Sequence, residues 1–406
     1  MTILPLLALL ALPSQAAPDF EAEAGAAVSA LAPADDSVWV TFDRADLAKP
    51  QAAAFPLRAT PVMTNSTSAV YKVRPSMLPV LSEFMHDNFH RCGGFLASRS
   101  QDAARTTLKA ASVRAASAYT LDQQAVAAPL VAKVTEGGMR ATISSLAAFN
   151  NRYYASDTGV QAAKWIQGQW QRLAAKIPGA TVELISHEGW SQPSVVLTVP
   201  GAETPDEIVV LGGHLDSING WGDSKSRAPG ADDNASGIAV LTEAARVLAE
   251  SGFRPKRTIQ FMGYAAEEVG LRGSQDIAER YASAGKKVVA VIQYDMSNFK
   301  GSSDEIYLLT DNVDDALSAF TGKLIDVYLG VPRSTTECGY GCSDHASWNR
   351  QGYPAAMAFE ASFEGMNHKI HTDQDTLANS GGDARHSVSF AKLAVAFAVE
   401  TAKTAH

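Results

Sequence analysis

The sequence predicts an α/β fold, with a mostly parallel central sheet covered by helices on both faces and preceded by a small α+β unit. After residue 138, short apolar runs alternate with segments of helical periodicity. Several apolar runs end directly in acidic or histidine residues. Strands of a parallel sheet are buried on both faces, so continuous apolar runs of this kind are typical of them.

The region before the α/β pattern is expected to hold a signal peptide, residues 1–16, and a propeptide with a linker, residues 17–117. An apolar run over residues 4–12 precedes a small-x-small cleavage pattern at residues 14–16. This pattern predicts export to the extracellular space. A permanent accessory domain is the alternative to a propeptide that is removed near Ala118.

Within this N-terminal region, residues 37–42 alternate like a strand and residues 77–89 have helical spacing. Residues 101–129 are rich in Ala, Thr, Ser and Gln, which predicts an exposed linker. Residues 118–406 are expected to form the catalytic domain. Its elements are predicted as helices over 158–173, 237–250 and 388–402 and strands over 182–185, 194–199, 207–213, 258–264, 288–294 and 354–359.

The overall charge and the cysteines restrict the class of protein. The net charge of −9 and the pI near 5.5 provide no basic footprint for nucleic acid or anionic lipid. After the N-terminus no apolar segment reaches the ~20 residues of a membrane helix. Cys338 and Cys342 enclose two glycines, which favours a small disulfide ring over reduced thiols or a metal-binding pair. Cys92 then remains as an odd, free thiol.

Polar side chains follow three of the predicted strands. His214 and Asp216 follow the strand 207–213, Glu267 and Glu268 follow 258–264, and Asp295 follows 288–294. In open α/β sheets, ligands bind beyond the carboxyl ends of the strands, so we expect these residues to converge. Mixed imidazole and carboxylate ligands favour zinc, with cobalt and manganese as the alternatives.

Each motif alone has a structural explanation. Asp232, Asp233 and Asn234 precede a predicted helix and are suited to capping it, although one cap does not explain two adjacent acids between glycines. A solvated surface pair at Glu267 and Glu268 fits poorly after an apolar strand. Asp295 alone is typical of a cap or turn.

His371 is equally ambiguous alone, because His345 and His368 lie nearby in the sequence. Nucleophilic catalysis is the rival chemistry, with Ser236, Ser343 and the Asp344–His345 pair as candidates, but the sequence lacks a Gly-x-Ser-x-Gly elbow. It also lacks a P-loop or a Gly-x-Gly-x-x-Gly after a strand.

Five segments together resemble the M28 zinc aminopeptidases. They are Gly-Gly-His-Leu-Asp-Ser at 212–217, Ala-Pro-Gly-Ala-Asp-Asp-Asn-Ala-Ser-Gly at 228–237, Ala-Ala-Glu-Glu-Val-Gly-Leu-Arg-Gly-Ser at 265–274, Cys-Gly-Tyr-Gly-Cys-Ser-Asp-His-Ala-Ser-Trp at 338–348 and Ile-His-Thr-Asp-Gln-Asp-Thr-Leu at 370–377. The last two are similar to the secreted bacterial leucyl aminopeptidases of Vibrio type. The resemblance starts near residue 143, and residues 90–94 resemble the propeptide of that group. The loop 217–227 and Asn234 depart from the pattern.

The resemblance implies a role for each motif residue. His214 and Asp295 would bind one zinc ion, Glu268 and His371 a second, and Asp233 would bridge them. Glu267 would be the general base, Asp216 the partner of the His214 imidazole, and Cys338–Cys342 the disulfide. An apolar pocket for the first side chain of the substrate would be formed by Met296, Tyr340, Met357, Phe359, Phe363 and Ile370.

These roles predict a secreted, monomeric di-zinc aminopeptidase that prefers Leu-like and large apolar N-terminal residues of peptides. Its own propeptide would act as an inhibitor or a folding aid. A mono-zinc glutaminyl cyclase-type acyltransferase and a non-catalytic binding module on the same fold are the alternatives. A carboxypeptidase would require a basic cluster for the substrate carboxylate, and none is evident in the sequence.

Overall fold

The computed structural model describes residues 36–89, 91, 93–108, 118–220 and 224–405. Contacts between Cα atoms divide the chain into Met1–Asp36 and Ser37–His406, and the elements below belong to the second unit. Several expectations lie outside the described residues. They are the signal peptide, the thiol of Cys92, the segment 109–117 before the expected cut, and residues 221–223 of the loop that departs from the family pattern.

The N-terminal part of the second unit is a small α+β arrangement. An antiparallel sheet of order β2-β3-β1-β4 packs on one helix through Val40, Phe42, Leu81 and Met85. The predicted strand 37–42 and helix 77–89 are therefore present. The elements are β1 (Val38–Asp43), α1 (Arg44–Leu47), β2 (Met63–Thr64), β3 (Ser68–Val73), α2 (Leu78–Phe89) and β4 (Leu96–Ser98), with 3₁₀ turns at Pro50–Ala54 and Pro75–Met77.

The linker predicted over 101–129 is wrong in part, because two helices lie within or across it. They are α3 (Gln101–Thr107) and α4 (Gln124–Val131). Ser100 caps α3 by accepting a hydrogen bond from the Ala103 N–H at 3.0 Å. Helix α4 buries Ala127 and Leu130 in the larger hydrophobic core, which lies on one face of the central sheet. An Ala-rich composition is compatible with helix as well as with linker, and here tertiary packing decides.

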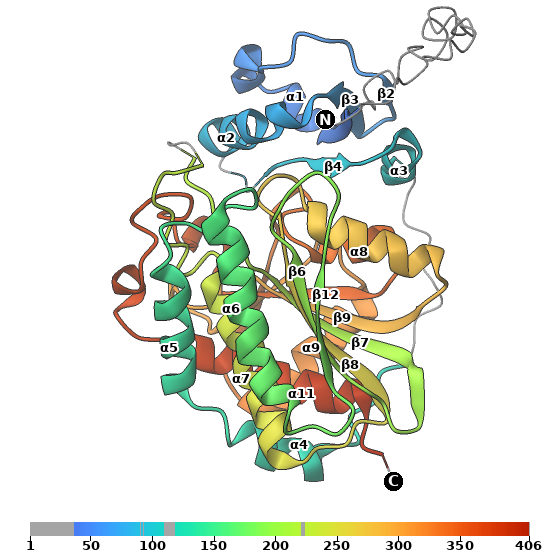
Figure 1. Cartoon of the computed structure of the whole chain (residues 1–406), viewed down its shortest axis with the longest axis vertical. Helices are drawn as coiled ribbons and strands as arrows, with labels where there is room; N and C mark the ends of the chain where they lie inside the picture. The colour runs from blue at the N-terminus through green and yellow to red at the C-terminus, as the bar shows by residue number, and fades with distance from the viewer. Residues whose placement is uncertain (1–35, 90, 92, 109–117, 221–223, 406) are drawn as a thin grey trace, which may run out of the picture. The chain divides into compact units, whose positions relative to one another are not determined.

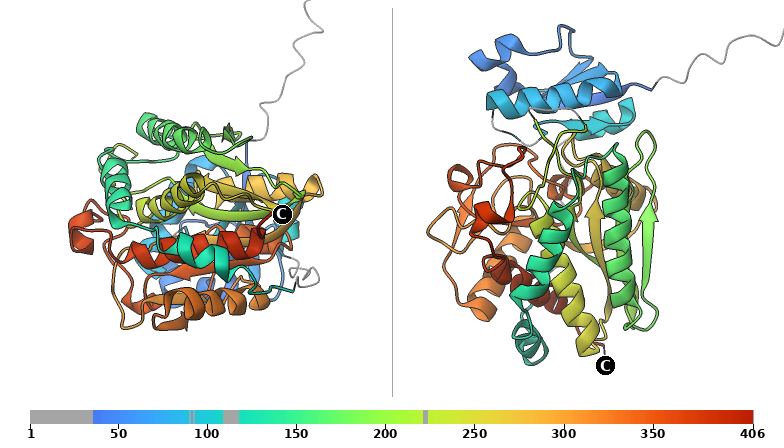
Figure 2. Two further views of the ribbon diagram at one scale, coloured as in Figure 1. Left: turned by 90° about the horizontal axis from the view of Figure 1, so that it is seen from below. Right: turned by 60° about the vertical axis from the view of Figure 1, so that its left-hand side comes forward.

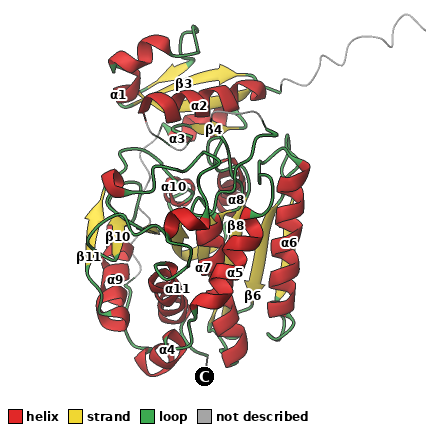
Figure 3. Cartoon of the chain, turned by 90° about the vertical axis from the view of Figure 1, so that its left-hand side faces the viewer, coloured by secondary structure: helices red, strands yellow, loops and turns green. Residues whose placement is uncertain are grey.

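The central sheet has the strand order β11-β10-β12-β9-β7-β8-β6-β5. The inner strands β12, β9, β7 and β8 are parallel to one another, whereas β6 and β5 are antiparallel at one edge and β10 pairs antiparallel with β12 near the other. Figure 3 shows β10 and β11 at this second edge. The strands are β5 (Thr181–Ile185), β6 (Ser194–Val199), β7 (Thr204–His214), β8 (Arg257–Tyr264), β9 (Lys287–Tyr294), β10 (Ile306–Leu309), β11 (Arg333–Thr336) and β12 (Ala355–Phe359).

Helices cover both faces of this sheet (Figures 1 and 2). Alternate residues of the strands face opposite sides, so Val209 packs with the helices of the larger core and Val210 with those of the smaller core. Besides α4, the larger core contains α5 (Glu136–Ala147), α6 (Asp157–Ala174), α7 (Ala235–Ser251), α9 (Asp315–Leu324) and α11 (Ser387–Ala402), and the smaller contains α8 (Arg272–Ser283) and α10 (His345–Arg350). This three-layer arrangement is the α/β fold that the sequence predicts.

Three neighbouring strands place the polar motifs at one edge. Strands β8, β7 and β9 lie side by side and in parallel (Figure 1), with His214 opposite Tyr264 and Gly212 opposite Gln293. Their carboxyl ends therefore coincide in space. Among the described residues, no helix is both long and apolar enough to cross a bilayer.

Candidate metal centre

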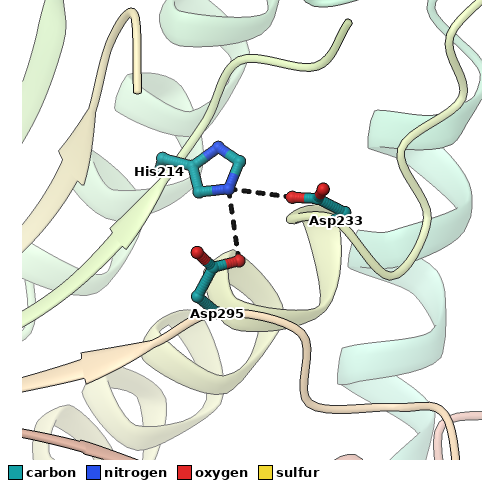
Figure 4. Close-up of side chains that lie close together, drawn as sticks. All are labelled: His214, Asp233 and Asp295. Atoms are coloured by element: carbon teal, nitrogen blue, oxygen red, sulfur yellow. Dashed lines mark hydrogen bonds and ion pairs between the residues drawn. The ribbon is translucent and has the colours of Figure 1, made fainter. Parts of the chain in front are cut away.

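His214, the last residue of β7, lies among carboxylates from two other elements. Its Nε2 is 2.9 Å from Oδ1 of Asp233 and 3.2 Å from Oδ1 of Asp295 (Figure 4). Asp295 directly follows β9, and Asp233 lies in the loop before α7. All three side chains are buried, and their ligand atoms lie within 4.8 Å of one another. They form the first of two groups that could hold a metal ion.

The second group shares Asp233. Nε2 of His371 is 3.2 Å from Oδ2 of Asp233 and 2.7 Å from Oε2 of Glu268. Asp233 thus offers one carboxylate oxygen to each group. His371 lies in the loop after β12 and has a left-handed backbone, with φ 56°. The structure therefore brings together all five residues that the sequence predicts as metal ligands.

The start of α7 brings Asp233 to the sheet edge. Asn234 caps the helix by accepting a hydrogen bond from the Gly237 N–H at 2.8 Å, and its amide donates to the Tyr294 carbonyl at 2.9 Å. A Cβ at Gly237 would lie 2.2 Å from the same carbonyl, so the close approach of α7 to β9 requires glycine. The capping interpretation of this motif is thus correct for Asn234, while Asp233 points to the histidines.

Asp216 fixes the backbone of the glutamate pair. Its carboxylate accepts hydrogen bonds from the N–H groups of Glu267 at 3.0 Å and Glu268 at 3.2 Å. Its Oδ1 also lies 3.5 Å from Nδ1 of His214. This contact agrees with the predicted partnership of Asp216 and His214. The two hydrogen bonds to main-chain N–H groups were missed, because every residue except proline has such a group and no sequence pattern marks them.

The charges of this centre are unbalanced without a cation. Burial, followed by the neighbouring Asp233, raises the pKa of Glu268 to about 7. Burial also raises the pKa of Glu267, and the charge of Glu268 adds to the shift. Burial alone would lower the pKa of His214, but Asp295 and Glu267 outweigh it and the net shift is upward. Neither carboxylate oxygen of Glu267 accepts a hydrogen bond from another described residue. Buried acids of this kind, with two imidazoles, fit a site for divalent zinc.

Residues around the ligands hold them in place. The Ser343 hydroxyl donates to Oδ2 of Asp295 at 2.6 Å, so this serine orients a ligand and is not poised as a nucleophile. The carboxylate of Asp375 accepts the N–H groups of Asp232 at 3.1 Å and Asp233 at 3.0 Å. Sequence reasoning missed both roles, although both residues lie within motifs already identified, at 338–348 and 370–377.

The competing candidates lie elsewhere. His345 begins α10 and is fully buried, and burial lowers its pKa to about 4. His368 is exposed, with Nε2 3.0 Å from the Glu364 carbonyl. The Ser236 hydroxyl donates to the Asp232 carbonyl at 2.6 Å. Among the described residues, neither His345 nor His368 belongs to a metal-binding group.

An apolar cluster lies beside the His371 segment. It unites all the residues that the resemblance assigns to a substrate pocket, and it also includes Tyr307, Leu309 and Met366. Cys338 and Cys342 form a disulfide in the same cluster. The Asp311 carboxylate accepts the Gly339 N–H at 2.9 Å and so holds this small ring. The predicted members are Met296, Tyr340, Met357, Phe359, Phe363 and Ile370.

The N-terminal α+β part contacts both the segments that carry the metal ligands and the apolar cluster. The Ser82 hydroxyl donates to the Glu268 carbonyl at 2.7 Å, and the Ala97 N–H donates to the Gly270 carbonyl at 3.1 Å. The ring of His86 lies 4.7 Å from that of His371, between centroids. The Arg91 guanidinium lies 4.6 Å above the ring of Tyr340.

Comparison with known proteins gives consistent results. The pattern of peptidase family M28 matches residues 194–396. A probable leucine aminopeptidase of Arthroderma otae is 42% identical over 286 residues, 70% of this chain and 78% of the relative. The crystal structure of the LapA aminopeptidase of Legionella pneumophila has a TM-score of 0.79 at 29% identity and covers 91% of this chain and 99% of that one. A Porphyromonas gingivalis glutaminyl cyclase has a TM-score of 0.55 at 18% identity over 66% of this chain and 99% of its own, which shows a shared fold.

Proposed function

Because the chain belongs to peptidase family M28 and is a metal-dependent aminopeptidase, we propose that it is a secreted enzyme that uses two zinc ions to release Leu-like and large apolar N-terminal residues from peptides. The observation that carries the two-ion assignment is the pair of ligand groups that share Asp233. A single ion, as in the glutaminyl cyclase alternative, would leave one of these buried groups without a cation.

His214 and Asp295 would hold one ion, His371 and Glu268 the other, and Asp233 both. When bound, zinc supplies Lewis acidity, which polarises a carbonyl group and lowers the pKa of water. Asp216 holds the backbone of Glu267 and Glu268. The ligands therefore do not need to reorganise when the substrate arrives.

Glu267 is the residue we assign to proton transfer. It is adjacent to a ligand, it is 1% exposed, and the described residues leave its oxygens without a hydrogen-bond donor. Burial raises its pKa, which favours uptake of a proton from the attacking water and delivery to the leaving amine. The positive charge of cations opposes this shift, so the carboxyl group can release the proton again.

The apolar cluster around Met357 and Phe359 would receive the first side chain of the substrate. Burial of apolar surface is non-directional, and one methylene contributes ~1–3 kcal/mol of discrimination. We therefore expect a broad preference for large apolar residues and not a single substrate.

Residues 1–16 would be the export signal, 17–117 the propeptide and linker, and 118–406 the mature catalytic domain. The disulfide between Cys338 and Cys342 supports the extracellular assignment, since disulfides persist in oxidising compartments. The contacts of His86 with His371 and of Arg91 with Tyr340 support inhibition by the propeptide. A substrate that reaches the ligands and the apolar cluster would have to displace these side chains.

Replacement of Glu267 by Gln tests the proposed chemistry. The amide cannot accept the proton, so we expect kcat on leucine p-nitroanilide to fall by at least ~10², with zinc content unchanged. The control is E250Q, which changes a partly exposed glutamate near the end of α7. Wild-type turnover in E267Q would end the general-base assignment.

A further inference from the structure

Arg152 is a buried cation in the segment between α5 and α6. The residue is 0% exposed and makes no salt bridge within the described part of the chain, although the charges of Asp375 and Asp233 raise its pKa against the effect of burial. Arginine is almost never fully buried without a partner, because removing its charge from water is costly. Burial lowers its pKa to about 10, which leaves it charged at neutral pH. Its position therefore requires an explanation other than packing.

The guanidinium group contacts main-chain carbonyls of two metal-ligand loops. Nε donates to the Leu215 carbonyl at 2.9 Å, directly after His214. Nη2 donates to the Gly230 carbonyl at 2.8 Å, and Nη1 donates to the Pro229 carbonyl. These two carbonyls lie in the loop that leads to Asp233. One planar group thus spans the loop of His214 and the loop of the shared carboxylate.

A second connection runs through the backbone of the same residue. The Arg152 N–H donates to the Ser217 hydroxyl at 3.0 Å, and that hydroxyl donates to the Ala228 carbonyl at 2.9 Å. Ser217 follows the His214 strand, and Ala228 begins the Asp233 loop. The two loops are therefore joined twice at Arg152.

The Asp233 loop is shaped to receive the guanidinium. Gly230 has φ +51°, and a Cβ there would lie 2.7 Å from Nη2 of Arg152 and 2.4 Å from the Asp233 carbonyl. The N–H groups of Asp232 and Asp233 are bound by Asp375. The carbonyl groups of this loop thus accept hydrogen bonds from Arg152, and its N–H groups donate hydrogen bonds to Asp375.

We propose that Arg152 is a positioning residue that sets the separation of the His214 and Asp233 loops, and so the metal affinity of the group formed by His214, Asp233 and Asp295. The proposal rests on the metal-binding function proposed above. Arg152 does not touch the ligand atoms and acts through the backbone of their loops.

The substitution R152K separates geometry from charge. Lysine keeps the positive charge, but a single ammonium group cannot span both loops as the rigid fork of arginine does. We expect R152K to bind Zn²⁺ and Co²⁺ about 10- to 100-fold more weakly, the usual effect of removing a supporting hydrogen bond from a metal ligand. The control is R172M, at an exposed position on α6.

The experiment uses the full chain after chelation and measures the affinity for Zn²⁺, the absorption spectrum of the Co²⁺ form, the thermal midpoint of the metal-free chain, and kcat and KM on leucine p-nitroanilide. The expected result for R152K is a weakened affinity, an altered Co²⁺ spectrum and a lowered kcat, with little change in KM. A purely structural role would lower the thermal midpoint and leave the Co²⁺ spectrum and the affinity of the folded chain unchanged, which would overturn the proposal.

S217A provides a second test if R152K does not fold. It removes one hydroxyl of the second connection, and we expect weaker Zn²⁺ binding in the same direction but of smaller size. Unchanged affinity in S217A, with R152K unfolded, would also overturn the proposal. A wild-type chain that binds no metal would instead refute the proposed function.

Discussion

The substitution D216N tests how the backbone of the glutamate pair is held. In the wild-type chain the carboxylate accepts two N–H groups, from Glu267 at 3.0 Å and from Glu268 at 3.2 Å. An asparagine amide has one accepting oxygen, so one N–H would lose its partner and face an NH₂ group. Asp216 is 1% exposed, so water cannot easily replace the missing acceptor.

The size of the effect follows from these contacts. A hydrogen bond to a charged acceptor contributes about 1.5–3 kcal/mol, and 1.4 kcal/mol corresponds to about a tenfold change in an equilibrium constant. If the loss acts through the position of Glu268, the affinity for zinc should fall by about tenfold to about a hundredfold.

The assay is competition for Zn²⁺ between the chain and a chromogenic chelator, with thermal unfolding of the metal-free and zinc-loaded forms. The matched control is D206N, which changes an exposed aspartate in the first part of β7, the strand that precedes Asp216. Wild-type zinc affinity in D216N would refute the view that Asp216 positions the pair. An equal loss in D206N would show that the assay reports charge alone.

Three further predictions follow from the same site. Burial and Asp233 raise the pKa of Glu268 to about 7, and the net pKa shift of His214 is also upward, so both ligands must lose a proton before they bind a cation and zinc affinity should rise with pH both below and above pH 7; a flat profile in chelator competition would contradict this. Met357 is 2% exposed in the apolar cluster, so M357A should lower the ratio of kcat/KM for Leu over Ala p-nitroanilides by about tenfold or more; an unchanged ratio would remove this cluster from substrate selection. Proteolytic removal of residues up to 117 should raise turnover on leucine p-nitroanilide; equal turnover before and after cleavage would end the inhibitory assignment of the contacts made by His86 and Arg91.

The sequence predicts the central strands because their burial on both faces produces continuous apolar runs. The run Ile208–Leu211 is fully enclosed in β7, and its carboxyl end carries His214. Once several strands of one parallel sheet are identified, convergence of the residues that follow them is a geometric consequence. For this reason the sequence predicts that His214, Glu268 and Asp295 converge. Asp233, which precedes a helix, and His371, which is ambiguous alone, are assigned by the family resemblance, and the structure brings all five together.

Short helices and supporting hydrogen bonds were harder to anticipate. Helix α3 has seven residues, too short to be stable alone, and an Ala-rich stretch is equally compatible with a linker. Arg152 acts on main-chain carbonyls, which every residue has, so no side-chain pattern marks its partners. Asp216 similarly binds main-chain N–H groups. Such contacts depend on the folded arrangement and not on residue spacing.

Titration of the metal-free chain with Zn²⁺ tests the central claim most directly, with bound zinc and turnover of leucine p-nitroanilide measured on the same samples. We predict that turnover is absent without zinc and that the chain binds two ions at full activity, one in each of the ligand groups that share Asp233. Full activity in a chain shown by elemental analysis to hold no metal would contradict the account, and saturation at a single ion would contradict the two-ion site.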